Sequence, residues 1–502
     1  MYKLGIDVGG TNIDFAVVDD KNQLRSGHKI LAKGELHLAI AEGLAQLQKN
    51  HGITLSSIAT IHLGTTLAIN SLLELKSLYK VGLIRLANHS PDFPPAYLWP
   101  KTYRDAIVVG YRNVSGGREY NNHSRKLLNR DELLFRIQEL IDNGAQSLAL
   151  VSVFAPLYSD DEIAAAHIIR NEFDIPVSLS HELGSLGFIE RENTTLLNAA
   201  LKKVLREGFQ SLTQTFTNLG FKGDCFITQN NGTLFTLEEA MMFPVKTIAS
   251  GPTNSLVGAC KLAKCENAVI VDIGGTSTDI GMVVDGFPLY SLQSGVVAGI
   301  SCNLLTPDIA TLAMGGGSII RRDNQHYTIG PDSLGADLFK KCQTRGGDNL
   351  TLYDVGQILK FQPNQDAENI MSYFLEQINQ ELVSLLPDLN SQLVLLVGGG
   401  AENIPSHLLS TNVIRPPHYQ IANAYGAALS EIAGHVDCIV QFGRDKESEL
   451  AALEEKAKAM AIQNGAESES IRIIEKKVLP LYYMHEPMYR VLITAVGPLQ
   501  TL

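Results

Sequence analysis

Two segments of this chain, residues 7–14 and 272–279, share the pattern Asp-x-Gly-Gly-Thr-x-x-Asp. Adjacent glycines let backbone N–H groups approach a phosphate without an intervening Cβ, and the threonine hydroxyl adds a hydrogen-bond donor. A carboxylate beside phosphates would repel them unless a divalent cation lay between the two. We therefore predict that both segments bind a polyphosphate, and that Asp7 and Asp272 hold Mg²⁺ through water molecules.

Each segment supplies candidate ligands. The predicted nucleotide-binding residues of the two segments are Gly9, Gly10, Thr11, Asn12, Gly274, Gly275, Thr276 and Thr278. Asp14 and Asp279 close the pattern and are the candidate catalytic residues, because each can orient its loop or a water molecule; turn capping explains them about equally well. A lone Gly-Gly-Thr is also an ordinary tight turn, so the prediction depends on the matched pair.

A third glycine-rich segment, Gly398, Gly399 and Gly400, follows an apolar, strand-like run at residues 393–397. The flat backbone of consecutive glycines suits the face of an adenosine, although a strand-to-helix turn without a ligand accounts for the same residues. Together with the two phosphate segments, it predicts a site for ATP and Mg²⁺.

Apolar runs flank both Asp-Gly-Gly-Thr loops, at residues 2–6 and 15–18 and at residues 268–271 and 280–284, so each loop is predicted as a hairpin tip. Elsewhere strand-like and helical periodicities alternate, which predicts an α/β fold around a mixed sheet. The helical segments are 36–49, 65–75, 131–143, 160–172, 190–219 and 446–464, and the strand-like ones are 58–63, 79–85, 147–154, 177–180, 224–228, 436–442, 471–475 and 489–495.

We predict three domains. Residues 1–185 form a half with the first hairpin, residues 186–434 form a half with the second hairpin and the triple glycine, and residues 435–502 form a small β-α-β-β appendix. A chain of 502 residues that is 45% hydrophobic can bury two or three cores.

Composition narrows the class of protein. A formal net charge of −12, with no run of lysine or arginine, argues against a nucleic-acid or anionic-membrane surface. The first residues do not form a basic segment followed by an apolar one, as in a secretion signal, and no apolar run of about 18 residues occurs. We therefore expect a soluble cytosolic protein. The six cysteines form no CxxC pair and the 13 histidines no HExxH, which predicts reduced thiols and no tightly held zinc.

Several further segments carry a resemblance to a known family. Residues 64–74 resemble the Gly-Thr-Thr-x-Ala-x-Asn-x-Leu-Leu-Glu stretch of the hydantoinase A and 5-oxoprolinase family, and residues 190–199 are similar to its Glu-Arg-x-x-Thr-Thr-x-x-Asn-Ala segment. Residues 250–252, 315–318, 329–333 and 422–428 resemble further blocks of that family in the same order. The duplicated hairpins also resemble the wider actin, sugar-kinase and heat-shock-chaperone ATPase superfamily. That resemblance implies two ribonuclease-H-like halves flanking a nucleotide cleft.

The family resemblance implies a chemistry. Members such as 5-oxoprolinase open a cyclic amide with ATP: phosphorylating the unreactive carbonyl oxygen gives an imidate-like species that water attacks readily. An ATP-dependent cyclic amide hydrolase is the leading expectation. A small-molecule kinase and a nucleotide-dependent binding or assembly ATPase remain open alternatives. The expected partners are a small-molecule substrate and a B-type hydantoinase subunit, in a homo- or hetero-oligomer.

Substrate contacts are expected in the matched blocks. Thr65, Thr66 and Asn70 begin a predicted helix whose N-terminal N–H groups could receive a carbonyl or anionic group, and N-capping explains Thr65 equally well. Glu192 and Ser318 are further candidates, for which a helix-facing or turn role is at least as good an explanation. The family commonly carries Thr-Lys-Gly-Phe where this chain has residues 85–89, and Pro-Gly-Pro where it has residues 336–338. Both segments are expected to border the substrate cleft.

Overall fold

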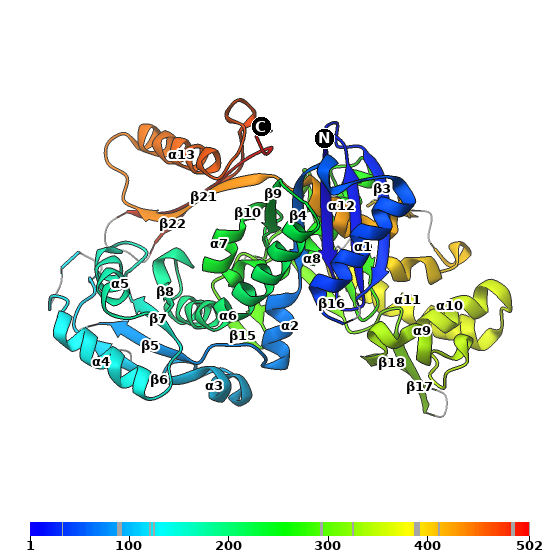
Figure 1. Cartoon of the computed structure of the whole chain (residues 1–502), viewed down its shortest axis with the longest axis horizontal. Helices are drawn as coiled ribbons and strands as arrows, with labels where there is room; N and C mark the ends of the chain where they lie inside the picture. The colour runs from blue at the N-terminus through cyan, green and yellow to red at the C-terminus, as the bar shows by residue number, and fades with distance from the viewer. Residues whose placement is uncertain are drawn as a thin grey trace.

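The computed structural model describes residues 1–32, 34–87, 93–119, 122–123, 126–291, 295–323, 326–385, 392–409, 412–482 and 487–500. Two mixed sheets carry the two predicted hairpins, and helices pack between and around them (Figure 1). The four-stranded sheet with α4 (Arg130–Asp142) and α5 (Asp160–Glu172) lies at one end of the molecule. At the other end lie the hairpin of β17 (Ser318–Asp323) and β18 (His326–Ser333) and the helices α9 (Leu338–Lys341), α10 (Leu352–Phe361) and α11 (Gln365–Leu385).

The first sheet has nine strands in the order β22-β23-β21-β10-β9-β4-β1-β2-β3. Its strands are β1 (Tyr2–Val8), β2 (Asn12–Val18), β3 (Leu24–Leu31), β4 (Ile58–Thr65), β9 (Asp224–Thr228), β10 (Leu234–Thr236), β21 (Ile432–Val440), β22 (Arg472–Leu481) and β23 (Met488–Gly497). The first phosphate loop joins β1 to β2, which pair antiparallel, while β1 pairs parallel with β4.

The second sheet repeats part of this plan in the order β13-β12-β11-β19-β20, with β16 also paired to β12. Its strands are β11 (Ala268–Ile273), β12 (Thr278–Val284), β13 (Phe287–Pro288), β16 (Ile309–Leu312), β19 (Val394–Val397) and β20 (Val413–Ile414). As in the first sheet, an antiparallel hairpin lies beside parallel strands. The chain therefore contains two halves of matching topology, each with one Asp-Gly-Gly-Thr hairpin, as the sequence predicted.

A four-stranded parallel sheet, β6-β5-β7-β8, is inserted between β4 and β9. Its strands are β5 (Val81–Leu86), β6 (Val108–Val114), β7 (Ser147–Ser152) and β8 (Val177–Leu179). The other elements are α1 (Leu36–His51), α2 (Leu67–Glu74), α3 (Lys101–Ile107), α6 (Phe188–Asn218), α7 (Leu237–Met242), α8 (Ser250–Ala263), α9 (Leu338–Lys341), α10 (Leu352–Phe361), α11 (Gln365–Leu385), α12 (Ala422–Leu429), α13 (Lys446–Gln463), β14 (Gly295–Val297), β15 (Ile300–Cys302), β17 (Ser318–Asp323) and β18 (His326–Ser333).

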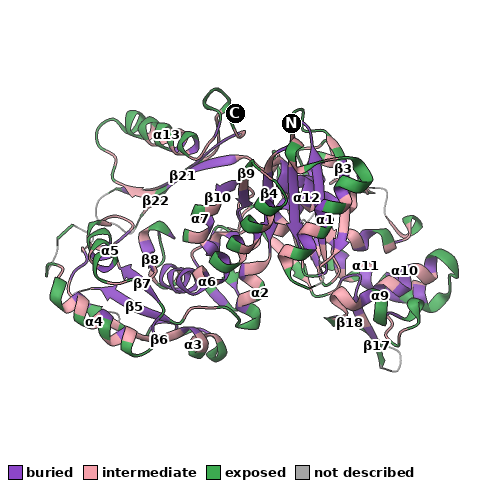
Figure 2. Ribbon diagram, in the orientation of Figure 1, coloured by how far each residue is buried: buried purple, intermediate pink, exposed green. Residues whose placement is uncertain are grey.

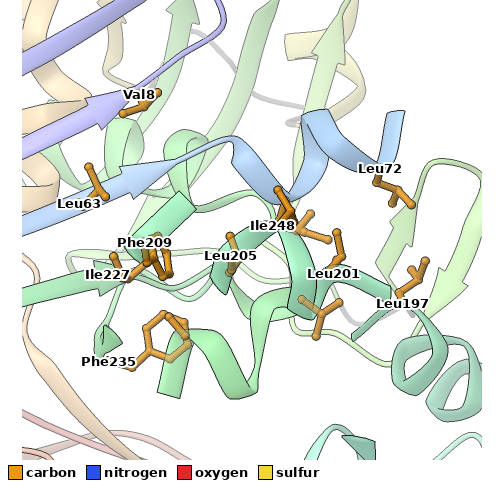
Figure 3. Packing of buried hydrophobic residues seen from close by; sticks show 14 of the residues in the cluster. Val8, Leu63, Leu72, Leu197, Leu201, Leu205, Phe209, Ile227, Phe235 and Ile248 are labelled. Atoms are coloured by element: carbon orange, nitrogen blue, oxygen red, sulfur yellow. The ribbon is translucent and has the colours of Figure 1, made fainter. Parts of the chain in front are cut away.

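The largest apolar core is organised around α6. Leu197, Leu201, Leu205 and Phe209 recur every four residues, which places them on one face of the helix. Figure 3 shows this face directed at apolar side chains from the neighbouring strands and loops, including Ile227. Full burial of each such side chain contributes about 1.5–3 kcal/mol. The helix and the central strands are accordingly among the most buried elements (Figure 2).

Two helices, α8 and α12, pack closely against each other where the halves meet. A Cβ at Gly258 of α8 would overlap the carbonyl oxygen of Ala422, and one at Gly426 of α12 would overlap that of Asn254. Glycine is therefore needed at both crossing points. This close packing brings the N-terminal ends of both helices near the first phosphate hairpin.

Sheet membership follows a different division of the chain from the sequence-based one. Strands β9 and β10, which fall within the predicted second half, pair inside the first sheet. The C-terminal strands β21 to β23 also join this sheet, through β21 and β10, with α13 packed on them. Across the described residues, no helix combines the length and the apolar composition needed to cross a bilayer.

Candidate functional site

The two phosphate loops have the same local geometry. In the first, Gly9 N donates to Asn12 O at 3.0 Å, and Asp7 lies opposite Asp14 across the hairpin. In the second, Gly274 N donates to Ser277 O at 2.9 Å, and Asp272 lies opposite Asp279. The duplication seen in the sequence is thus a duplication of backbone hydrogen bonds and strand register.

The loops meet across a single cleft of about 1240 Å³. A Cβ placed on Gly275 would come within 2.7 Å of Thr11 Oγ1, so the two hairpin tips are in direct contact. The predicted site residues that line this cleft are Asp7, Gly9, Gly10, Thr11, Asn12, Asp14, Thr65, Thr66, Asn70, Asp272, Gly274, Gly275, Thr276, Asp279, Gly398, Gly399 and Gly400. Residues that are far apart in the sequence therefore share one pocket.

Five aspartates line this cleft, and four of them, Asp7, Asp14, Asp272 and Asp279, belong to the two hairpins. Asp7 and Asp14 are buried, whereas Asp272 and Asp279 are partly exposed. Loss of hydration, followed by the charge of Asp14, raises the pKa of Asp7 to about 7, and loss of hydration raises the pKa of Asp279 to about 6. The same cause raises the pKa of Asp14 and of Asp272. A cation in the cleft would favour the charged form of all four groups.

These carboxylates fit a magnesium ion that arrives with a nucleotide. Within the described residues, no three His, Cys, Asp or Glu side chains come together as a ready metal cage. Mg²⁺ is usually held by one or two carboxylates, with phosphates and water completing its coordination. Asp7 Oδ1 is buried beside the side-chain amide of Asn254, and a carboxylate oxygen that accepts one hydrogen bond keeps a further lone pair for a cation or its water. Asp7 and Asp272 would hold the ion.

The triple glycine is pressed against the second hairpin. Gly398 has a φ of 87°, and a Cβ there would overlap Asp272 Oδ1. A Cβ on Gly400 would lie 3.0 Å from Gly274 O. Glycine is therefore required for this loop to approach the second hairpin so closely, and all three glycines line the cleft.

Lys29 is a cleft residue that the sequence reasoning missed. Its Nζ lies 2.8 Å from Asp14 Oδ1, and a Cβ on Gly399 would lie 3.4 Å from the same ammonium. The ammonium thus sits between the first hairpin and the glycine loop of the other half, where it can offset phosphate charge. Its sequence signal is its position on β3 opposite Asp14, which becomes visible only once the β2–β3 register is known.

Asn423 is a second residue that was not predicted as part of the site. Its Nδ2 donates to Asp7 Oδ2 at 2.8 Å from the first turn of α12. Asn423 lies inside a family-like block, but nothing in that block points to a partner in the first hairpin. The hydrogen bond orients the Asp7 carboxylate toward the cleft.

The predicted substrate residues of α2 line the cleft but already have partners. Thr66 Oγ1 donates to Val8 O and accepts from Asn70 Nδ2, and Leu67 N donates to Thr65 Oγ1. Thr65 is not the N-cap residue that the alternative explanation required: Thr66 is at that position and makes no side-chain cap hydrogen bond, and Thr65 precedes it. These contacts fix the start of α2 against the end of β1.

Three predicted site residues lie outside the cleft. Thr278 is buried and donates to Met314 O, and Ser318 Oγ accepts from Gly315 N in a turn. Both Glu192 carboxylate oxygens accept hydrogen bonds from Arg85, at 2.7 and 2.8 Å. The structure therefore gives these side chains structural partners in place of a ligand, because each polar group is buried and must be paired.

The segments that depart from the family pattern have different positions. Arg85 is buried in the ion pair with Glu192, and residues 88 and 89 lie outside the described residues. Leu338 lines the cleft. His62 is a buried core histidine: Nδ1 lies 3.0 Å from Ala427 O, and burial lowers its pKa to about 4. All six cysteines are free.

Two matching halves that meet at one cleft, each with an aspartate-glycine hairpin, define an actin-like ATPase type of α/β fold. The chain belongs to the hydantoinase/oxoprolinase family. The model of that family's N-terminal region matches residues 3–173, and the hydantoinase/oxoprolinase model matches residues 191–366, so the two together cover more than half of the chain.

Individual relatives agree with this assignment. The chain is 29% identical over 388 residues to the caprolactamase subunit alpha of Pseudomonas jessenii, covering 72% of this chain and 54% of that protein. It is 27% identical over 274 residues to the 5-oxoprolinase of Saccharomyces cerevisiae, covering 52% and 21%. The chain therefore spans about half the length of the first relative and less of the second. The crystal structure of the ATP-dependent caprolactamase from Pseudomonas jessenii superposes with a TM-score of 0.79 at 21% identity, covering 99% of this chain and 88% of that one.

Proposed function

We propose that this chain binds Mg-ATP in the cleft and uses it to phosphorylate the carbonyl oxygen of a small cyclic amide or related metabolite, before ring opening. The observation that carries the proposal is the contact of two equivalent hairpins, each with an aspartate pair, across one cleft. The caprolactamase and 5-oxoprolinase relatives act on cyclic amides by name. Their family membership supports the same class of reaction here.

Each part of the cleft has a proposed role. The amides and hydroxyls of the two hairpin tips bind the phosphates, and the Lys29 ammonium offsets their charge. Asp7 and Asp272 hold Mg²⁺, which supplies charge neutralisation at the phosphates when bound. Gly398 to Gly400 offer the flat surface for the adenosine.

The two candidate catalytic aspartates differ in their partners. Lys29 contacts Asp14, which suits Asp14 to orienting the loop and the lysine. Asp279 accepts a 2.6 Å hydrogen bond from Thr311 and has a pKa raised to about 6, close to neutral pH. A base with such a pKa can take a proton from water and still be regenerated. Asp279 is therefore the better candidate for the proton acceptor.

The proposal extends to partners and location. The caprolactamase relative is named as a subunit, so we propose that this chain works in a hetero-oligomer with a B-type subunit that completes the hydrolysis. The acidic charge of −12 and the six free cysteines support a cytosolic location.

The proposed function is tested by measuring ATP hydrolysis with a panel of cyclic amides. At least one amide is expected to accelerate ATP turnover, and Asp272→Asn is expected to abolish that acceleration. Asp285→Asn is the matched control, because Asp285 is exposed just after β12 and has a φ of 52° that asparagine tolerates.

Phosphorus-31 NMR of the same reactions separates the alternatives. Release of inorganic phosphate with ring opening is the expected result. A stable phosphorylated organic product would instead identify a small-molecule kinase. ATP turnover that no metabolite accelerates, together with nucleotide-dependent binding of a protein, would identify a binding or assembly ATPase.

A further inference from the structure

The N-terminus of α8 lines the cleft and has no side-chain cap; Ser250 is buried there, and Ala249 and Gly251 are partly exposed. Its N-cap residue, Ala249, has a φ of 67° and offers no side-chain hydrogen bond. The first backbone N–H groups of a helix have no intrahelical acceptor, so a buried helix end needs a partner from a side chain, water or a ligand. The amides of Ser250 and Gly251 find no acceptor in the described part of the chain.

Ser250 is the second observation at this place. Its side chain lines the cleft and is 1% exposed, yet Oγ makes no hydrogen bond to any described residue. A buried hydroxyl without a partner costs about 1–3 kcal/mol, so such groups are rare unless something binds them. The unpaired hydroxyl and the two unpaired amides lie in consecutive residues at one wall of the cleft.

The nearest carboxylate does not satisfy these donors. A Cβ on Gly251 would lie 3.7 Å from Asp7 Oδ1, but neither the amides of Ser250 and Gly251 nor the Ser250 hydroxyl donates to that oxygen. Asp7 is therefore free to face a cation, and the end of α8 is free to face an anion beside it. The end of α8 thus lies next to the first hairpin without being part of it.

The surrounding wall has a mixed character. Ile69, Ile248 and Val296 supply apolar surface in the same cleft, which is also lined by Thr66 and Asn70, whose side chains hydrogen-bond to each other. Such a wall fits a small, partly apolar molecule that presents one carbonyl or carboxylate oxygen. A helix N-terminus stabilises negative charge on an oxygen, whether it is present from the start or develops during reaction.

We propose that the N-terminus of α8, with Ser250 Oγ and the amides of Ser250 and Gly251, binds the substrate oxygen that receives the phosphoryl group. The inference rests on the proposed function in taking the nucleotide to lie between the hairpins. Ser250 holds the acceptor oxygen on one side, and the hairpin tips hold the phosphates on the other. In the transfer, the acceptor oxygen forms a bond to the terminal phosphorus, the bond from that phosphorus to the bridging oxygen breaks, and ADP leaves with the electron pair. The amide N–H proton passes to solvent, which leaves an uncharged imidate carrying the phosphoryl group.

The test uses inorganic phosphate as the probe of an oxyanion site. The full chain is saturated with Mg²⁺ and a non-hydrolysable ATP analogue, so that the terminal phosphate position is filled, and phosphate is titrated calorimetrically. The wild-type protein is expected to bind one further phosphate, and Ser250→Ala is expected to weaken that binding about tenfold, the value of one hydrogen bond to a charged group. Ser185→Ala is the matched control, because Ser185 also carries a buried, unpaired hydroxyl but lies outside the cleft.

The outcomes separate this inference from the proposed function. Equal binding of phosphate by Ser250→Ala and the wild-type protein would overturn the inference, as would the absence of phosphate binding to the wild-type protein. Phosphate binding only in the presence of ADP would also overturn it, because the site would then be the terminal phosphate position. If the ATP analogue itself does not bind, the proposed function fails, and the same titration without nucleotide still reports on α8.

Discussion

Replacing Asp7 with asparagine should make the protein more stable and inactive at the same time. The pKa of Asp7 is raised from 3.8 to about 7, first by burial and then by the charge of Asp14. A shift of about three units corresponds to about 4 kcal/mol between the two protonation states. The folded state binds the Asp7 proton more tightly than the unfolded chain does. Protonation of Asp7 therefore raises the free energy of unfolding; this contribution is complete below about pH 4 and is lost as the pH rises through 7.

The Asp7→Asn variant has no ionisable group at position 7, so it avoids the cost of a buried carboxylate that the wild-type protein bears above pH 7. Its side-chain oxygen can still accept the hydrogen bond from Asn423. Without nucleotide at pH 8, its thermal midpoint should exceed that of the wild-type protein by roughly 4 °C, from about 4 kcal/mol and the typical unfolding entropy per residue. At pH 4 the two midpoints should agree.

Thermal unfolding at a series of pH values, with Asp285→Asn as control, provides the assay. Calorimetry in buffers of different ionisation enthalpy should also show that Mg-nucleotide binding to the wild-type protein releases a proton near pH 6.5, because a cation favours the ionised carboxylate. The variant should release less. A midpoint for Asp7→Asn below that of the wild-type protein at pH 8, or a difference that does not change with pH, would refute the reasoning.

Three further predictions follow from the contacts in the cleft and behind it. Lys29→Met should weaken binding of a fluorescent ATP analogue about tenfold, as expected for the loss of one charge-assisted hydrogen bond. Lys76→Met, which removes an exposed lysine, should leave the affinity unchanged. Equal affinities of the two variants would argue against a role for Lys29. Gly275→Ala should reduce nucleotide affinity, because its Cβ would come within 2.7 Å of Thr11 Oγ1, and a crystal structure of the variant should show the hairpin tips further apart. Glu192→Gln should destabilise the protein by about 3–5 kcal/mol, since it leaves the buried Arg85 without its counter-ion. Thermal unfolding checks this, and an unchanged midpoint would contradict the structural role.

Local patterns predicted the two hairpins and most of the long helices. The apolar runs on either side of each Gly-Gly pair indicated a hairpin, whereas the pairing of Asp7 with Asp14 across it was seen only in the structure. The predicted helix at residues 190–219 is observed as α6 (Phe188–Asn218), because its apolar residues recur every three to four positions. These features depend on neighbours in the sequence.

The features that the sequence did not reveal depend on long-range pairing. Lys29 enters the site through the β2–β3 register, and Asn423 meets Asp7 although 416 positions separate them. Glu192 lies in a family-like block, and only the packing of α6 against β5 shows that its partner is Arg85. Strands β21 to β23 extend the first sheet because β21 pairs with β10. The sequence of a strand does not show which other strand it will pair with, so this addition was not predicted.

The central claim is that one magnesium-bound triphosphate bridges the two hairpins. A crystal structure with Mg²⁺ and a non-hydrolysable ATP analogue tests it most directly. The account predicts a single nucleotide whose phosphates contact both Gly9–Asn12 and Gly274–Ser277, with Asp7 and Asp272 on the side of the metal. A nucleotide bound by only one of the two hairpins, or at a site away from both, would contradict it.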